Sequence, residues 1–306
     1  MTALPSAFAS PRLRAALLRL AAVAGLLLAG AAQAAPPYSG TIYLTPNLIT
    51  AADPTEYVNA SYIGQAPRQM FDRRVNAFVV YNAFVFDVAF ANGYHVEAQV
   101  NPEFGSPAAA YAEVDYYARV IGRLPRALRT HVATLWLHRG DQPFGGGNNN
   151  LLIHTGSYAA DYIARGILEE TLAHEATHTS IDPNHAAAFG WLMAQAWDRE
   201  YLSTYARDNP TREDLAETFL MWLAVRHGMA RIPPDVAYNV LTTVPNRLAY
   251  FDQLRPDLAP YVYTHPEPRR GAAVRARGPS RRVAAQREAA CGAPAPGLRL
   301  RTAAIG

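Results

Sequence analysis

Two patterns of hydrophobic and polar residues divide the chain into a strand-rich part and a helix-rich part. Residues 76–90, NAFVVYNAFVFDVAF, are dense in Val, Phe and Tyr, and residues 94–100, YHVEAQV, alternate between apolar and polar positions. Asn92-Gly93 separates these runs, and Asn-Gly between two such runs predicts a β-hairpin. The alternation places one set of side chains on a single face of the second strand: Tyr94, Val96, Ala98 and Val100.

Shorter apolar runs extend the strand prediction on both sides of this hairpin. Residues 36–54 have strand-like character followed by turn residues, and residues 132–138 and 151–156 predict short buried strands. Residues 106–124 predict a helix that follows the hairpin. From residue 168 to about 260 the pattern is helical. Strands followed by helices favour the α+β class, with N-terminal strands and a helical C-terminal half.

The N-terminus has the pattern of a secretory signal. Three Arg precede an apolar run, LAAVAGLLLAG, that ends in Ala32-Gln33-Ala34, an A-x-A cleavage pattern. We therefore predict a signal peptide over residues 1–34 and a mature protein that begins near Ala35 and is secreted or periplasmic. The run is short for a membrane span, which leaves an uncleaved anchor as the weaker alternative. No second apolar segment of spanning length follows, so we expect no stable membrane span after cleavage.

The net charge of +3 hides an uneven distribution of charge. Residues 266–306 carry nine Arg against two Glu, and the leader carries three more Arg. Residues 35–265 keep 16 Arg against 23 acidic residues, a balance of −7. An acidic domain argues against nucleic acid as its partner. The basic tail, 266–306, has no apolar periodicity and is typical of a disordered segment, which leaves 35–265 as the folded domain.

A short stretch on the first C-terminal helix carries candidate chemistry. His174 and His178 are four positions apart and face the same side of a helix, and Glu175 directly follows the first histidine. Two imidazoles can bind one metal ion in this arrangement, and the glutamate can take a proton from a water at the open position. The only cysteine, Cys291, lies in the tail, so any metal must be held by His, Asp or Glu. The alternative is a helix with two exposed histidines.

A catalytic zinc ion needs a third protein ligand, and the sequence offers more than one. Asp182 follows closely but has the character of a turn residue. In TREDLAETF, Glu213 and Glu217 lie one helical turn apart. Glu213 is the better ligand, because Glu217 can then accept the other ring N–H of a ligating histidine. Asp214, three residues after Thr211, fits a helix cap.

His185 is a further candidate for the third ligand, because the metzincin family has a ligand histidine shortly after its second histidine. The metzincin spacing requires a glycine at 181 and a ligand at 184, where this chain has Ile181 and Asn184. We therefore set the metzincin interpretation aside.

HEATH followed by YARDNPTREDLAETF resembles the gluzincin metallopeptidases, and among them the catalytic domain of anthrax lethal factor. The likeness covers residues 168–222 and implies a zincin-like fold. In that fold Glu213 is the third zinc ligand, and Glu217 is the carboxylate that contacts a ligand and holds it in place. It also implies that Tyr205 assists the oxyanion, although its spacing from the glutamate helix is one residue longer than in that pattern. The chain is similar as well to secreted bacterial proteins that share the HTSID and EDLAETF stretches.

Together these features predict an exported zinc-dependent peptidase that hydrolyses peptide or protein substrates, with Glu175 as general base. Two alternatives stay open: a non-catalytic surface or adhesion module whose zinc is structural or lost, and a zinc hydrolase of a non-protein amide. His154 is a candidate to line the cleft, although a half-buried structural role is more usual for such a histidine. FGGGNNN at 144–150 predicts a loop. Three tryptophans are predicted to lie in the core: Trp191, Trp197 and Trp222.

Overall fold

The computed structural model describes residues 35–45 and 47–261. The described residues from Pro36 on belong to one compact unit. The predicted signal peptide and basic tail, with Cys291, lie outside the described residues. Within the described part, no helix is both long and apolar enough to cross a membrane.

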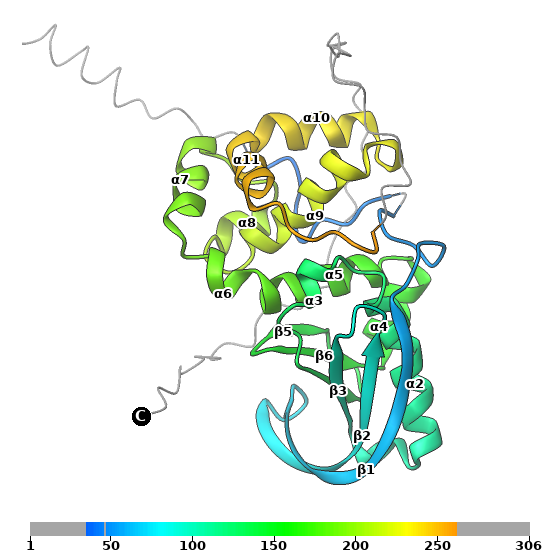
Figure 1. The fold of residues 1–306 in the computed structure, drawn as a ribbon. Coiled ribbons are helices and arrows are strands. Elements are labelled where there is room, and N and C mark those ends of the chain that lie inside the picture. Colours follow the sequence, from blue (N-terminus) through cyan, green and yellow to red (C-terminus); the bar gives the residue numbers. More distant parts are fainter. Residues whose placement is uncertain (1–34, 46, 262–306) are drawn as a thin grey trace, which may run out of the picture. The chain divides into compact units, whose positions relative to one another are not determined.

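The strands form one mixed sheet in the order β1-β2-β3-β4-β6-β5 (Figure 1). Their bounds are β1 Tyr57–Asp72, β2 Ala77–Phe90, β3 His95–Val100, β4 Thr134–His138, β5 Gly145–Gly147 and β6 Asn150–His154. The pairs β1/β2, β2/β3 and β5/β6 are antiparallel, and β3/β4 and β4/β6 are parallel. β5 and β1 therefore form the two edges of the sheet, and β5 is the edge that contacts α5.

The hairpin predicted around Asn92-Gly93 is confirmed as β2 and β3, paired from Ala89 with His95 onward. The face predicted for β3 is also confirmed, because Val96, Ala98 and Val100 are buried. Residues 36–54 were expected to contain a strand, and that prediction is wrong: apart from an isolated bridge between Tyr38 and Ser203, the described residues 36–45 and 47–54 have no helix or strand.

Ten α-helices lie in the described part of the chain. Their bounds are α2 Pro107–Ile121, α3 Arg126–Arg129, α4 Ser157–Ala164, α5 Leu168–Ser180, α6 Asp182–His185, α7 Phe189–Asp198, α8 Thr204–Asp208, α9 Asp214–His227, α10 Pro234–Thr243 and α11 Pro245–Leu254. The predicted helix after the hairpin is α2, and the Ser106 hydroxyl caps it by accepting from Ala109 N. The α+β prediction, with helices dominating after residue 156, is confirmed at this level.

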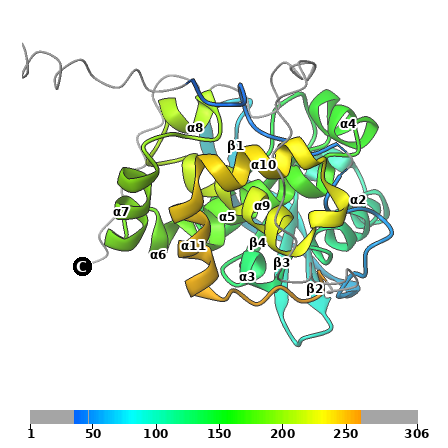
Figure 2. The ribbon, with the colours of Figure 1, turned by 90° about the horizontal axis from the view of Figure 1, so that it is seen from above.

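Helix α5 is the central element of the fold (Figure 2). It contacts β5 and β6 on one side and α9 on the other, and α2, α3 and α4 also pack against it. All of its residues except His178 are buried, including charged and polar ones. The alternative of a surface helix with two exposed histidines is therefore wrong.

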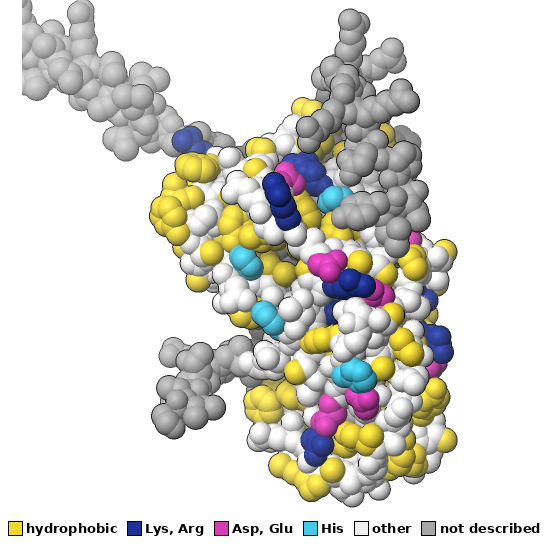
Figure 3. All heavy atoms as spheres, in the orientation of Figure 1, with side chains coloured by type: hydrophobic (Ala, Val, Ile, Leu, Met, Phe, Trp, Pro, Cys, Tyr) yellow, Lys and Arg dark blue, Asp and Glu magenta, His cyan; other side chains and the backbone are white. Residues whose placement is uncertain are grey.

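Exposed hydrophobic side chains gather on α7 and along the β1–β2 hairpin (Figure 3), and others lie on α2, α4 and α10. Trp197 on α7 is 64% exposed, so its predicted place in the core is wrong. The other two tryptophans, Trp191 and Trp222, are buried as predicted and pack around Phe251.

Candidate metal centre

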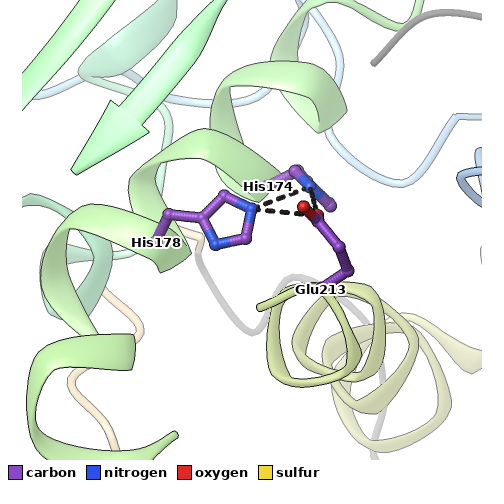
Figure 4. A group of neighbouring side chains, drawn as sticks. All are labelled: His174, His178 and Glu213. Carbon is purple, nitrogen blue, oxygen red and sulfur yellow. Dashed lines mark hydrogen bonds and ion pairs between the residues drawn. The ribbon is translucent and has the colours of Figure 1, made fainter. Parts of the chain in front are cut away.

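Three side chains from two helices converge on one point beside α5. His174 and His178 lie one turn apart on α5, and Glu213 is the residue immediately before α9 (Figure 4). The two Nε2 atoms are 3.1 Å apart, and Glu213 Oε2 lies 3.3 Å from each of them. These three residues form the group in the described part of the chain that could hold a metal ion.

The triangle has the size that tetrahedral coordination of a small ion requires. With bonds of about 2.0–2.1 Å and tetrahedral angles, two ligand atoms of one zinc ion lie about 3.3 Å apart. The observed separations of 3.1 and 3.3 Å are close to that value. Two imidazoles and one carboxylate also leave a fourth position for water or substrate. The residues present therefore fit a metal ion held by three protein ligands.

The mutual contacts of the three side chains shift the pKa values of Glu213 and His178. Burial opposes the charged form of Glu213, but hydrogen bonds from His174 and His178 hold its pKa well below the usual range. Burial alone would lower the pKa of His178, but hydrogen bonds to Asp182 and Glu213 raise it to about 10. The site thus favours positive charge at its centre, where a cation can take the place of a proton.

Asp182 orients one of the histidines. Its Oδ2 lies 2.7 Å from His178 Nδ1, while Nε2 of the same ring faces Glu213. Asp182 therefore contacts the Nδ1 side of the ring and lies outside the group of three residues that could hold a metal ion. Sequence reasoning missed this role, although the signal was present: Asp182 follows His178 by four residues, and only Ile181 separates α5 from α6.

Helix α5, the ligand helix that carries His174 and His178, lies very close to the edge strand β5. A Cβ atom added to Gly146 would lie 1.8 Å from the backbone oxygen of Glu175, so only glycine fits there. Thr179 links the two elements, because its hydroxyl donates to Asn150 O at 2.7 Å and accepts from Gly147 N at 2.8 Å. The FGGGNNN stretch, expected to be a loop, thus contains a strand whose glycines permit close contact with α5.

Glu213 is held in place by the buried start of α9. Asp214, the first residue of α9, was expected to cap the helix, and this is wrong: no side-chain cap is present. Its Oδ2 instead lies 2.9 Å from Arg247 Nε and 2.8 Å from Gln195 Nε2. Both side chains of the ion pair are fully buried. Contacts to α7 and α11 therefore fix the backbone beside the third ligand.

Glu217 lies one turn after Glu213 and is buried. Its Oε2 accepts a hydrogen bond from the backbone N–H of Ile42 at 3.1 Å and lies 3.5 Å from Ser203 Oγ. Burial raises its pKa to about 7, and the nearby His174 opposes that shift. A hydrogen bond from a ligating histidine to Glu217 stays a prediction.

The two residues predicted to act in catalysis lie on elements that border the ligands. Glu175 follows His174 on α5, and it is 6% exposed. Tyr205 lies on α8, whose N-cap Ser203 is the residue near Glu217. The roles of Glu175 and Tyr205 stay predictions.

His154 does not belong to this site. It is fully buried at the end of β6 and stacks on His138, with ring centroids 5.1 Å apart. Its Nδ1 lies 3.1 Å from the backbone oxygen of Arg139, and burial lowers its pKa. The structure thus supports the structural role rather than the cleft-lining one.

Comparison of the chain with protein-family models, with curated proteins and with solved structures found no match. The functional assignment therefore depends on the geometry of the site and on the resemblance of its motifs.

Proposed function

We propose that the protein is an exported zinc-dependent peptidase with a zincin-like fold of gluzincin type. The observation that carries the proposal is the triangle of His174 Nε2, His178 Nε2 and Glu213 Oε2, with sides of 3.1 and 3.3 Å. This donor set is the one used by His₂Glu zinc peptidases. His174, His178 and Glu213 would hold the ion, and Asp182 would keep the proton of His178 on Nδ1.

Each remaining residue has a specific task in this proposal. Zinc bound at the site would supply a Lewis acid and lower the pKa of a water molecule. Glu175 would take the proton of the attacking water and later deliver it to the leaving amine. Tyr205 would donate a hydrogen bond to the carbonyl oxygen as negative charge develops there.

The edge strand β5 supports a peptide as the substrate. It pairs with β6 on one side and lies against the ligand helix, within contact of Glu175. An extended peptide can add to a sheet edge by main-chain hydrogen bonds, which would lay it alongside α5. The strand of His154, β6, is internal to the sheet, whereas β5 is the edge.

A cleavage assay with matched variants tests the proposal. The purified mature protein is incubated with a mixed peptide library, and products are identified by mass spectrometry. The protein should cleave a subset of peptides, and Glu175→Gln should not, because an amide cannot take the proton. Glu169→Gln, six residues before Glu175, should cleave like the wild type. Equal cleavage by Glu175→Gln would exclude this mechanism. A protein that cleaves no peptide but does cleave a non-protein amide would instead be a zinc hydrolase of such amides.

A further inference from the structure

A segment without regular structure packs like a core element between the two ligand helices. We call residues 36–45 and 47–49 the N-terminal strap. Tyr38 binds the chain before α8 through two backbone hydrogen bonds, with Leu202 O at 3.1 Å and Thr204 N at 3.0 Å. Four apolar side chains of the strap are buried in the main core: Ile42, Leu44, Leu48 and Ile49. The strap is drawn in dark blue in Figure 1.

Two buried carboxylates hold the strap, one from each ligand helix. Glu170 on α5 accepts from Leu44 N at 2.9 Å with Oε2 and from Leu48 N at 2.7 Å with Oε1. Glu217 on α9 accepts from Ile42 N at 3.1 Å. The strap therefore connects α5 to α9 through directed hydrogen bonds in addition to its apolar packing.

Both carboxylates lie one helical turn from a metal ligand. Glu170 precedes His174 by four residues, and Glu217 follows Glu213 by four. One turn of an α-helix advances about 5.4 Å, so each anchor lies close to the ligand that its helix contributes. A shift of the strap would move the two helices relative to each other and so change the distance between the histidines and Glu213.

Buried carboxylates of this kind fix the position of the strap more than they stabilise the fold. A buried carboxylate carries a large desolvation cost, and an apolar contact of similar volume would stabilise the fold at least as well. Burial raises the pKa of Glu170 to about 7, which reflects that cost. What a carboxylate adds is direction, because hydrogen bonds of 2.7–3.1 Å fix the relative position of the groups they join.

We propose that the N-terminal strap is a part of the metal centre: through Glu170 and Glu217 it positions α5 against α9 and thereby sets the metal affinity of His174, His178 and Glu213. The inference depends on the proposed zinc site but not on peptidase activity. Glu170 is a positioning residue that touches neither the metal nor the substrate. Coupling between two sites is reciprocal. Metal binding must therefore stabilise the packed strap by the same free energy by which the packed strap stabilises the bound metal.

The first test compares two adjacent glutamates of α5. Glu170→Gln weakens the anchor of the strap, and Glu169→Gln is the matched control, because Glu169 binds Arg123 at 3.2 Å instead. Zinc affinity is measured by competition with a chelator, well below the melting temperature of each protein. We expect Glu170→Gln to lose at least about fivefold in affinity, within the usual range of coupling between sites, and Glu169→Gln to stay close to the wild type. The absorption spectrum of bound Co²⁺ should change in Glu170→Gln alone.

The second test uses the wild-type protein and does not depend on a variant that folds. Hydrogen–deuterium exchange of the Ile42, Leu44 and Leu48 amides is measured with and without zinc. Zinc should slow exchange at these amides, and the exposed turn at Ala51 and Ala52 should exchange alike in both states.

The outcomes separate this inference from the proposed function. A wild-type protein that binds no zinc overturns the metal centre and with it the role of the strap. A wild-type protein that binds zinc, with unchanged affinity and Co²⁺ spectrum in Glu170→Gln and unchanged exchange of the strap amides, overturns the role of the strap alone.

Discussion

Asp182 Oδ2 lies 2.7 Å from His178 Nδ1, on the far side of the imidazole from the Nε2 atom that faces Glu213. With a metal ion on Nε2, this contact would keep the remaining ring proton on Nδ1, facing Asp182. Asp182 is the first residue of α6, and only Ile181 separates it from the end of α5.

Replacing Asp182 by alanine should weaken zinc binding without abolishing it. The ring of His178 would lose its orientation, and changes of this kind usually reduce metal affinity by about 10- to 100-fold. Chelator competition measures the effect. Asp161→Ala is the control, because Asp161 forms an exposed i,i+4 pair with Arg165 far from the ligand triangle in the chain. A loss as complete as that of His178→Ala would instead make Asp182 a ligand.

Replacing Tyr205 by phenylalanine should reduce the rate of peptide cleavage but not the zinc content. If its phenol donates to the developing oxyanion, its removal should lower kcat by about 100-fold, as for other donors of this kind. Steady-state kinetics and metal analysis of the same sample separate the two effects. Tyr238→Phe, at an exposed position of α10, is the control. An unchanged kcat would remove Tyr205 from the mechanism.

Replacing Gly146 by alanine should separate β5 from the ligand helix. The new methyl group would lie 1.8 Å from Glu175 O, a backbone atom that cannot move without the helix. Overpacking typically costs about 1–3 kcal/mol, which predicts a melting temperature lower by several degrees. Gly190→Ala is the control, because its Cβ would meet only the ring of Tyr250, at 3.1 Å. Equal melting temperatures for both variants would contradict the close contact of β5 with α5.

His138 should make the protein less stable in acid. Burial, reinforced by the neighbouring His154, lowers its pKa from the usual 6.5 to about 4. Between these values the unfolded chain binds a proton that the folded protein does not, so the free energy of unfolding falls as the pH drops. The full effect is about 3 kcal/mol.

The measurement is the melting temperature at pH 7 and at pH 4.5, in the presence of a chelator to remove the contribution of bound metal. His138→Gln cannot take up the proton and should lose less stability than the wild type over this range. His95→Gln, at an exposed position, should follow the wild type. The same loss in all three proteins would show that His138 is not the group responsible.

The parts of the site that follow from short-range spacing could be predicted from the sequence. His174 and His178 share a face because a helix repeats every 3.6 residues, and Glu213 was favoured over Glu217 by the same periodicity. The structure brings these three residues together as expected. Asp214 was misassigned because local spacing suggested a cap, whereas a distant side chain, Arg247, determines its contacts.

The parts that depend on long-range contacts could not be predicted. The residues of β1 follow no strict alternation of apolar and polar positions, and Gly64 and Pro67 lie inside it; it is a strand because it pairs along the whole of β2. The apolar and polar residues of the strap follow neither the helical period nor the strand period. Its bond from Ile42 to Glu217 spans 175 positions of the chain, and no local pattern reports such a contact.

The zinc content of the purified mature protein, compared with that of its Glu213→Ala and Glu175→Gln variants, tests the central claim most directly. The wild type and Glu175→Gln should each hold about one zinc ion per chain, because Glu175 is not among the ligands, and Glu213→Ala should hold little, because two imidazoles leave the ion short of a ligand. A wild-type protein without zinc, or a Glu213→Ala variant that keeps zinc as tightly as the wild type, would contradict a metal centre of His174, His178 and Glu213.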